Sequence, residues 1–333
     1  ALRRARRIEP TRFTATWLAS DTMTYYAQYA KGNKPGGFNT DAENARIQPA
    51  DRAALATLGL RSFDEEEADS FEIGFKSRLF DRRVQLNTAL YLIDWTNQQL
   101  TQTGPVLEEG RPVGAPTQPQ FGTSYTANLG KSEVRGVEME MLAALGPHWN
   151  LRMTYAYQDA KIKEYFSSDQ ADLIFSGPYT GCIAGSQCYA DYLAAGDLGG
   201  NVLPRVPEHL ASASLAAKYP LGSWGTFNWR ADYSYEASRY VQVHNLAETG
   251  DAHVVNMRLG IERDAWSATL WVNNLTDDDT VIDVMRTVNP GVFLVVPVQP
   301  PLPGTVSATN PRDFAVTLAD RRMFGLTLMY RFR

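Results

Sequence analysis

The sequence lacks any long apolar run. None of its 333 residues belongs to a stretch of about 18 consecutive apolar residues, the length that a membrane-spanning helix needs. The mean hydropathy is only -0.31. Transmembrane helices are therefore excluded. A membrane β-barrel is not, because a barrel strand needs only about 9–11 residues and presents every second one to lipid.

Cysteine and histidine are scarce, with two and four residues. Cys182 and Cys188 have no histidine near them in the sequence, so a zinc site would lack ligands. We interpret the pair as a disulfide that closes a small loop in an oxidising compartment, with free thiols as the alternative. The scattered histidines and the lack of a serine-centred elbow leave no catalytic constellation. We therefore predict no enzyme activity, no resident metal and no cofactor.

Positive charge is also limited. The formal net charge is -5 and the isoelectric point is about 5.5. The one basic cluster, Arg3, Arg4, Arg6 and Arg7, lies at the extreme N-terminus. A nucleic-acid-binding protein would normally carry a larger basic patch, so nucleic acid is not predicted as a partner. The first residues also lack the apolar core of a signal peptide.

What the sequence does contain is alternation of apolar and polar residues. In the segment 226–235, aromatic and apolar side chains occupy one face, and Arg230, Asp232 and Ser234 occupy the other. The segments 149–158, 255–262 and 326–332 alternate in the same way. This period of two predicts β-strands. Alternation alone fits both a soluble sandwich and a membrane barrel.

The lengths of the connections separate these two folds. Eleven strand-like segments are predicted to begin near Arg12, Thr22, Ala68, Val84, Tyr125, Trp149, Glu208, Gly225, His253, Trp266 and Met323. Short turns alternate with long links, which cover about 31–67, 101–124, 161–207, 239–252 and 275–322. An antiparallel meander with this pattern has one trimmed end and one elaborated end, as outer-membrane barrels do. The fold predicted is therefore an all-β, transmembrane antiparallel barrel.

Five segments resemble the TonB-dependent outer-membrane receptors. They are TYYAQYAKGNKPGGFN (24–39), FEIGFKSRLFDRRVQLNTALYLID (71–94), NLGKSEVRGVEMEM (128–141), WVNNLTDDD (271–279) and FGLTLMYRF (324–332). The fourth is similar to the family's Asn-Leu-x-Asp passage. The fifth is similar to its final strand, although Arg333 follows the terminal aromatic residue. Together these segments span nearly the whole chain.

The resemblance implies a barrel of about 22 strands that an N-terminal plug domain fills. About eleven strands here would be half of it. Residues 1–333 are then expected to be the C-terminal portion of a single barrel domain, with the plug and the first half of the barrel outside this sequence. The final strand would run towards the periplasm. The short turns would therefore be periplasmic and the long loops extracellular.

The function implied is energised uptake of a scarce solute across the outer membrane, with a ferric siderophore as the first expectation. A sugar, cobalamin or an aromatic compound are alternative solutes, and a passive porin is an alternative function. The partners implied are the TonB–ExbB–ExbD complex, reached through the missing plug, outer-membrane lipid and lipopolysaccharide, and the barrel-assembly machinery. Tyr330 and Phe332 would form the C-terminal assembly signal.

Candidate binding residues lie in the loop 161–207. Tyr165, Phe166, Tyr179, Tyr189 and Tyr192 surround the predicted disulfide, and aromatic side chains on long loops suit binding by stacking. The alternative is that they pack against neighbouring loops. Two acidic runs, Asp64–Glu67 and Asp277–Asp279, are predicted to be a solvated loop face and a rim of hydrogen bonds, with cation binding as the alternative. Trp17, Trp149, Trp224 and Trp266 adjoin the short turns and are predicted to be interfacial anchors.

Overall fold

The computed structural model describes residues 11–39, 62–103, 124–167, 170–171, 185–288, 294–297, 306–309 and 312–332. Its main sheet has eleven strands, in the order β1-β2-β5-β6-β7-β8-β9-β10-β11-β12-β17. Their bounds are β1(Thr11–Ser20), β2(Met23–Lys34), β5(Glu66–Leu79), β6(Val84–Thr103), β7(Ser124–Ala144), β8(Trp149–Tyr165), β9(His209–Pro220), β10(Thr226–Glu236), β11(Ala252–Arg263), β12(Trp266–Asn273) and β17(Met323–Tyr330). The eleven predicted strands are confirmed, and each begins within two residues of its predicted start.

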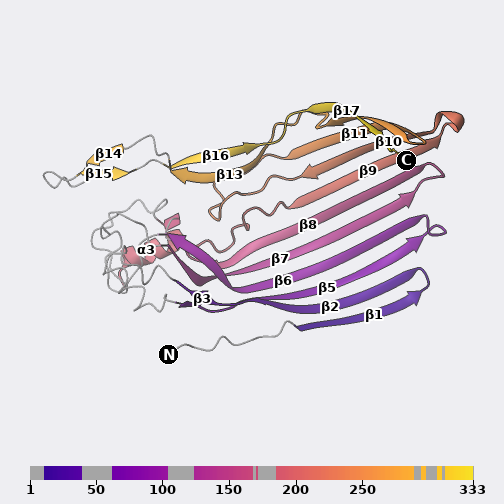
Figure 1. Ribbon diagram of the computed structural model, residues 1–333. Coiled ribbons are helices and arrows are strands. Elements are labelled where there is room, and N and C mark those ends of the chain that lie inside the picture. Colours follow the sequence, from indigo (N-terminus) through magenta and orange to yellow (C-terminus); the bar gives the residue numbers. More distant parts are fainter. Residues whose placement is uncertain are drawn as a thin grey trace. The chain divides into compact units, whose positions relative to one another are not determined.

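The chain divides into two compact units. Unit 1 comprises Ala1–Glu140 and Ala156–Val206, and unit 2 comprises Met141–Tyr155 and Pro207–Arg333. Besides its strands of the main sheet, unit 1 holds the short pair β3(Gly37–Phe38) and β4(Ser62–Phe63) and the helix α3(Gln187–Gly196). Unit 2 also holds the hairpin of β13(Val281–Val288) with β16(Arg312–Leu318), and the short pair β14(Leu294–Pro297) with β15(Val306–Thr309) (Figure 1).

The predicted short turns join consecutive strands of the main sheet. Two residues connect β1 to β2 and β11 to β12, and a single turn of 3-10 helix, Gly222–Trp224, connects β9 to β10. The β5–β6 turn places Phe80, Asp81 and Arg82 in the left-handed region, with φ of 52°, 54° and 66°. Such compact turns leave little room for a binding site, so the long links are the better candidates for one.

The apolar face of the sheet is exposed. Leu328, Phe324 and Trp17 are 71%, 78% and 66% exposed. Among the described residues the largest fully buried side chains are Tyr192 and Leu198, and neither belongs to a strand of the main sheet. A soluble sandwich would bury this face under a second sheet, whereas a barrel in a membrane presents it to lipid. No described helix is long and apolar enough to span a bilayer.

The polar face is packed by aromatic side chains that lie over glycine. Tyr26 covers Gly74, its register partner on β5, and Trp271 covers Gly325, its register partner on β17. A Cβ at Gly74 would lie 2.6 Å from the Tyr26 hydroxyl. That hydroxyl donates to Glu72 at 2.6 Å, and the Trp271 Nε1 donates to Thr327 at 3.2 Å. Glycine at these positions thus permits the rings to lie flat against the strand.

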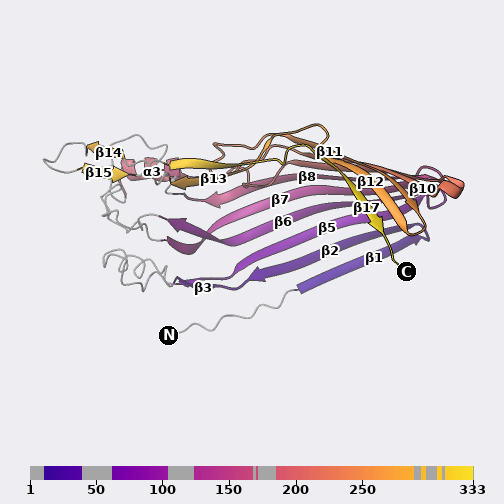
Figure 2. The same cartoon turned by 45° about the horizontal axis from the view of Figure 1, so that its top comes forward.

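Aromatic residues also cluster beside the short turns. Trp149 donates its Nε1 hydrogen to the Tyr219 hydroxyl at 2.6 Å and meets Trp229 edge-on, with ring centroids 5.6 Å apart. Trp17 stacks on Tyr25, with ring centroids 5.5 Å apart. Trp224 and Trp266 are exposed. An amphipathic ring at the end of a strand suits the interface between lipid and water, which is the role predicted for these tryptophans. Figure 2 shows the strand ends from a second direction.

The assignment of faces makes a testable prediction at the centre of β9. Leu215 lies in the apolar row and Ser214 in the polar row, where Ser214 bonds to Asp232. We expect Leu215→Arg to lower the free energy of unfolding by about 2–4 kcal/mol, since the cation would face the hydrocarbon core. Ser214→Arg, the matched control, should cost much less because its cation reaches water and Asp232. Urea unfolding in lipid vesicles measures both. The reverse order would mean that the faces are exchanged.

Candidate functional site: the rim at the long-loop end

The turn that follows β12 occupies the base of the last long loop. Its sequence is Asn274-Leu275-Thr276-Asp277-Asp278-Asp279. Asn274 and Asp277 have φ of 50° and 56°, in the left-handed region that asparagine and aspartate tolerate better than most residues. The turn therefore folds tightly, and the chain then continues into β13.

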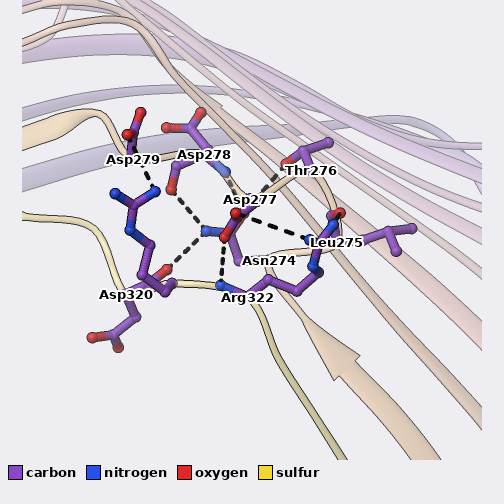
Figure 3. Close-up of polar contacts among 9 residues, drawn as sticks. Asn274, Leu275, Thr276, Asp277, Asp278, Asp279, Asp320 and Arg322 are labelled. Atoms are coloured by element: carbon purple, nitrogen blue, oxygen red, sulfur yellow. Dashed lines mark hydrogen bonds and ion pairs between the residues drawn. The ribbon is translucent and has the colours of Figure 1, made fainter.

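The Asn274 side chain joins the two ends of this loop. It is 5% exposed and donates from Nδ2 to the carbonyl oxygens of Asp278 and Asp320, both at 2.8 Å (Figure 3). Its Oδ1 accepts from the Asp278 backbone N–H at 2.9 Å and from the Thr276 hydroxyl at 3.3 Å. The amide thus uses all the hydrogen bonds that it is able to make. It ties the end of β12 to the segment that leads into β17.

The aspartates extend this junction. Asp277 Oδ1 accepts from the Arg322 backbone N–H at 2.9 Å, and the Arg322 side chain donates to the Leu275 carbonyl at 3.3 Å. Arg321 lies 3.2 Å from Asp279 in an exposed ion pair, which contributes little in water. We call Asn274, Asp277, Asp278, Asp320 and Arg322 the rim clamp.

Asp278 connects the rim clamp to β11. Its Oδ2 accepts from the His253 backbone N–H at 2.6 Å, and its Oδ1 accepts from the Thr280 backbone N–H at 2.9 Å. Burial opposes ionisation of this carboxyl, but hydrogen bonds from the Thr280 side chain and from both backbone groups outweigh it. The pKa of Asp278 is consequently below its ordinary value. The predicted role in rim hydrogen bonding is confirmed for Asp277 and Asp278, whereas Asp279 contributes only its exposed ion pair with Arg321.

The acidic run Asp64–Glu67 forms a second loop base, in unit 1. Glu66 is 7% exposed and accepts from the Gln99 backbone N–H at 2.7 Å, and Glu67 pairs with Lys31 at 2.9 Å. The Asn128 side chain makes two hydrogen bonds to the Asp64 backbone. Its Oδ1 accepts from the Asp64 N–H at 2.6 Å, and its Nδ2 donates to the Asp64 carbonyl at 2.9 Å. The predicted solvated loop face is therefore wrong for Glu66 and Glu67, which bond to neighbouring strands. No group of three or more metal-binding side chains occurs within the described residues.

The aromatic residues of the loop after β8 form a small core of their own. Tyr192 on α3 is 2% exposed, and its ring centroid lies 6.0 Å from that of Phe166. Ala171, Cys188 and Tyr189 complete this core. The Ser186 hydroxyl caps α3 by accepting from the Tyr189 backbone N–H at 3.2 Å. The structure thus brings Phe166, Tyr189 and Tyr192 together as packing residues.

Only some of these aromatic side chains are exposed enough to contact a solute. Tyr165, Phe166 and Tyr189 are half-buried, whereas Tyr192 is buried and presents almost no surface to a solute. Tyr179 and Cys182 lie outside the described residues. Cys188 is disulfide-bonded, and its predicted pairing with Cys182 stays a prediction. At the C-terminus Tyr330 and Phe332 meet edge-on, with ring centroids 4.9 Å apart, and both are exposed.

Sequence reasoning missed the amide side chains at the loop bases. Gln99 donates from Nε2 to three backbone carbonyls, those of Lys34, Pro35 and Asp64. Asn39 and Thr126 exchange two bonds, at 2.7 and 2.8 Å. The available signal was the position of these amides, each near the point where an alternating segment gives way to a long link.

A family model described as "TonB dependent receptor-like, beta-barrel" matches residues 11–275. The chain belongs to this family. Its members are β-barrel proteins of the outer membrane, and the exposed apolar face places this chain there as well. The named relatives are receptors rather than enzymes.

Individual relatives are more distant. The chain is 24% identical to a probable TonB-dependent siderophore receptor, PiuA, of Acinetobacter baumannii over 147 residues, which is 44% of this chain and 16% of that protein. The structure resembles the ferric yersiniabactin uptake receptor FyuA of Yersinia pestis, with a TM-score of 0.62 at 16% identity, over 97% of this chain and 37% of that one. It also resembles the solved PiuA structure, with a TM-score of 0.59 at 18% identity, over 96% of this chain and 35% of that one. The chain therefore spans little more than a third of these receptors, and at such identities the likeness shows the fold alone.

Removing the Asn274 amide should open the base of the last loop. We expect Asn274→Ala to lower the free energy of unfolding by about 2–3 kcal/mol, because the buried Asn274 amide is lost and the carbonyls of Asp278 and Asp320 lose their donor. Asn274→Gly, which accepts the left-handed backbone freely, should be nearly as destabilising if the amide is what matters. Leu275→Ala, in the same turn, should change stability by about 1 kcal/mol or less. Urea unfolding gives the energies. Faster proteolysis within 281–318 in the Asn274 variants alone would locate the opening.

The lowered pKa of Asp278 gives a second prediction. A carboxyl with a depressed pKa stabilises the fold above its unfolded-state pKa, near 3.8, and loses that contribution as the pH falls through the folded pKa. Asp278→Asn should therefore be less stable than the parent protein at neutral pH, and the two should converge in acid. Unfolding measured from pH 7 to pH 3 tests this, with Asp264→Asn in the β11–β12 turn as the control. A difference that is independent of pH would contradict it.

Proposed function

We propose that this chain forms part of a TonB-dependent receptor that takes up a scarce solute across the outer membrane, and that the solute is a ferric siderophore. The family match over residues 11–275 is the observation that carries the proposal. The names of PiuA and FyuA, a siderophore receptor and a ferric yersiniabactin receptor, support the siderophore class. We propose no enzyme activity for it.

We further propose that residues 1–333 are the C-terminal portion of one barrel domain. The sheet has eleven strands, and the chain covers 37% and 35% of the FyuA and PiuA structures. A first half of the barrel and a plug would then make up the remainder of a receptor of about 22 strands. The plug would contact the TonB–ExbB–ExbD complex, which supplies the energy.

The loop bases support solute capture at the extracellular end. The rim clamp, and the bonds of Gln99 to Asp64 and of Asn128 to Asn97, hold the ends of long links in place. In the loop after β8, Tyr165, Phe166 and Tyr189 are the described candidates for solute contact, and Tyr179 is a further candidate. Tyr192 would act by holding α3 in place.

Other partners follow from the surface. The exposed apolar face would contact outer-membrane lipid, with lipopolysaccharide at its outer edge. The exposed Tyr330 and Phe332 at the end of β17 would serve as the signal for the barrel-assembly machinery.

A transport experiment tests the proposed function. A strain lacking the gene should lose uptake of radioactive iron from one class of ferric siderophore under iron limitation, and the full-length gene should restore it. Uptake should also require TonB, since energy coupling distinguishes a receptor from a passive porin. Induction by a sugar or an aromatic compound alone, or loss of cobalamin uptake with unchanged iron uptake, would contradict the siderophore assignment.

A further inference from the structure

The outer face of β7 changes from apolar to charged towards the long-loop end. Met139 is exposed in the row that faces lipid. Gly136 points to the opposite face, where a Cβ would run into the ring of Tyr91 on the polar side of β6. Because successive side chains of a strand alternate between its faces, Arg135 and Glu133 continue the outer row beyond Met139.

Two cations converge on Glu133. The Arg135 Nη2 lies 2.7 Å from the Glu133 Oε1, and the Lys163 Nζ on β8 lies 3.0 Å from the same oxygen. The Glu133 side chain is only 17% exposed, whereas those of Arg135 and Lys163 are 61% and 46% exposed. The carboxylate therefore lies beneath the cations, which present their remaining donors outward. One carboxylate shared by two cations leaves an excess of positive charge.

Two further lysines extend this charged surface. The Lys131 Nζ lies 2.7 Å from Glu164, and the Lys161 Nζ lies 3.0 Å from Asp159. We call Lys131, Arg135, Lys161 and Lys163 the outer cationic patch. Its four cations meet three carboxylates, so the patch as a whole is positive. Exposed ion pairs of this kind contribute little to stability, so the fold alone does not account for the patch.

Neither the plug nor the remaining strands of the proposed receptor reach this surface. β7 and β8 lie in the middle of the sheet, with four strands on one side and five on the other (Figure 1). The first half of the barrel would join the free edges of β1 and β17, and the plug would fill the lumen on the polar side. The outer face of β7 and β8 therefore stays open to the membrane and to the layer above it.

The height of the patch indicates which lipid adjoins it. Lys131 lies eight residues beyond Met139. This separation corresponds to about 26 Å along the strand, or about 20 Å in height at a strand tilt of about 40°. The headgroup layer of a phospholipid bilayer is only about 5–8 Å thick on each side. The patch thus extends above a phospholipid headgroup and fits a lipid with a taller anionic head.

We propose that the outer cationic patch binds the phosphorylated sugar core of lipopolysaccharide, while the apolar row below it contacts the acyl chains. The phosphates and acidic sugars of the core complement the excess positive charge. The Arg135 guanidinium is able to bind a phosphate through paired, charge-assisted hydrogen bonds. The proposal rests on the lipopolysaccharide contact proposed above and deepens it by naming the residues. It does not depend on which solute is transported.

The experiment uses the full-length receptor in detergent micelles. Fluorescently labelled lipopolysaccharide with a phosphorylated core is titrated at low salt, with divalent cations removed by a chelator, and anisotropy reports binding. We expect the affinity to fall about fivefold in Arg135→Gln and in Lys163→Gln, and about 25-fold in the double variant. Added salt should narrow these differences, because it screens exposed charges.

Two controls accompany the titration. Arg152→Gln removes the same charge from the polar row of β8, beside the lipid-facing Met153, and should bind as the parent protein does. Lipid A without the sugar core is the second probe. The parent protein and the double variant should bind it equally, because the patch lies above its phosphates. Urea unfolding without lipid should have the same midpoint in all variants, since only exposed ion pairs are removed.

Four outcomes would overturn the proposal. The double variant could bind lipopolysaccharide as the parent protein does, or it could lose affinity for lipid A to the same degree. A lower unfolding midpoint in the double variant would assign the cations to the fold. Displacement of the labelled lipid by an equal concentration of inorganic phosphate would assign the patch to a free anion.

A charge-keeping variant and the choice of probe keep the result interpretable. Arg135→Lys combined with Lys163→Arg preserves both charges and should retain most of the affinity, and a loss as large as in the double glutamine variant would contradict a role for charge. Binding is read without iron or any transported solute. A failure here therefore leaves the transport result untouched, and a failure of siderophore transport leaves the lipopolysaccharide titration valid.

Discussion

Backbone hydrogen bonding within lipid is the constraint on which this structure depends. No water is available in the hydrocarbon core, so every N–H and C=O there needs a partner within the protein. β10 and β11 satisfy it through an unbroken register from Thr226↔Glu262 to Glu236↔Ala252. Once the ladder is complete, each strand has two faces with different solvents. The outer face carries apolar side chains without any covering layer, and the inner face carries Arg230, Asp232 and their neighbours.

The ends of the ladder need other partners, and side-chain amides supply them. Where β12 stops, Asn274 bonds to two carbonyls and one N–H. Near the start of β5, Asn128 likewise bonds to two carbonyls and one N–H, and Gln99 donates to three carbonyls. An amide carries donors and an acceptor on one short side chain, which suits a junction where both kinds of backbone group are left without strand partners. Aspartates add charge-assisted bonds to the same junctions.

The strands were predictable because a period of two is written directly into segments such as 226–235. The loops were not, since their contacts join residues far apart in the chain with no periodic signal. Asn274 bonds to Asp320, and Asn128 to Asp64, across 46 and 64 positions. Glu66 looked like one member of an exposed acidic run, yet it is buried against Gln99. Tyr192 looked like a surface ring, but a short helix turns it inward onto Ala171. The convergence of Arg135 and Lys163 on Glu133 was equally hidden, because it needs the register of two strands as well as their alternation.

The rim clamp has a consequence for how receptors of this kind diversify. The rim clamp joins the two ends of this loop at its base. Lengthening such a loop raises the free energy of loop closure only slightly, by about 0.6 kcal/mol for each doubling of its length. Insertions, deletions and wholesale replacement between β13 and β16 therefore leave the strands below nearly unaffected. A lineage that keeps Asn274 and its partners is free to exchange everything outside them. New binding surfaces are then able to evolve in the loop while the strands of the barrel stay unchanged.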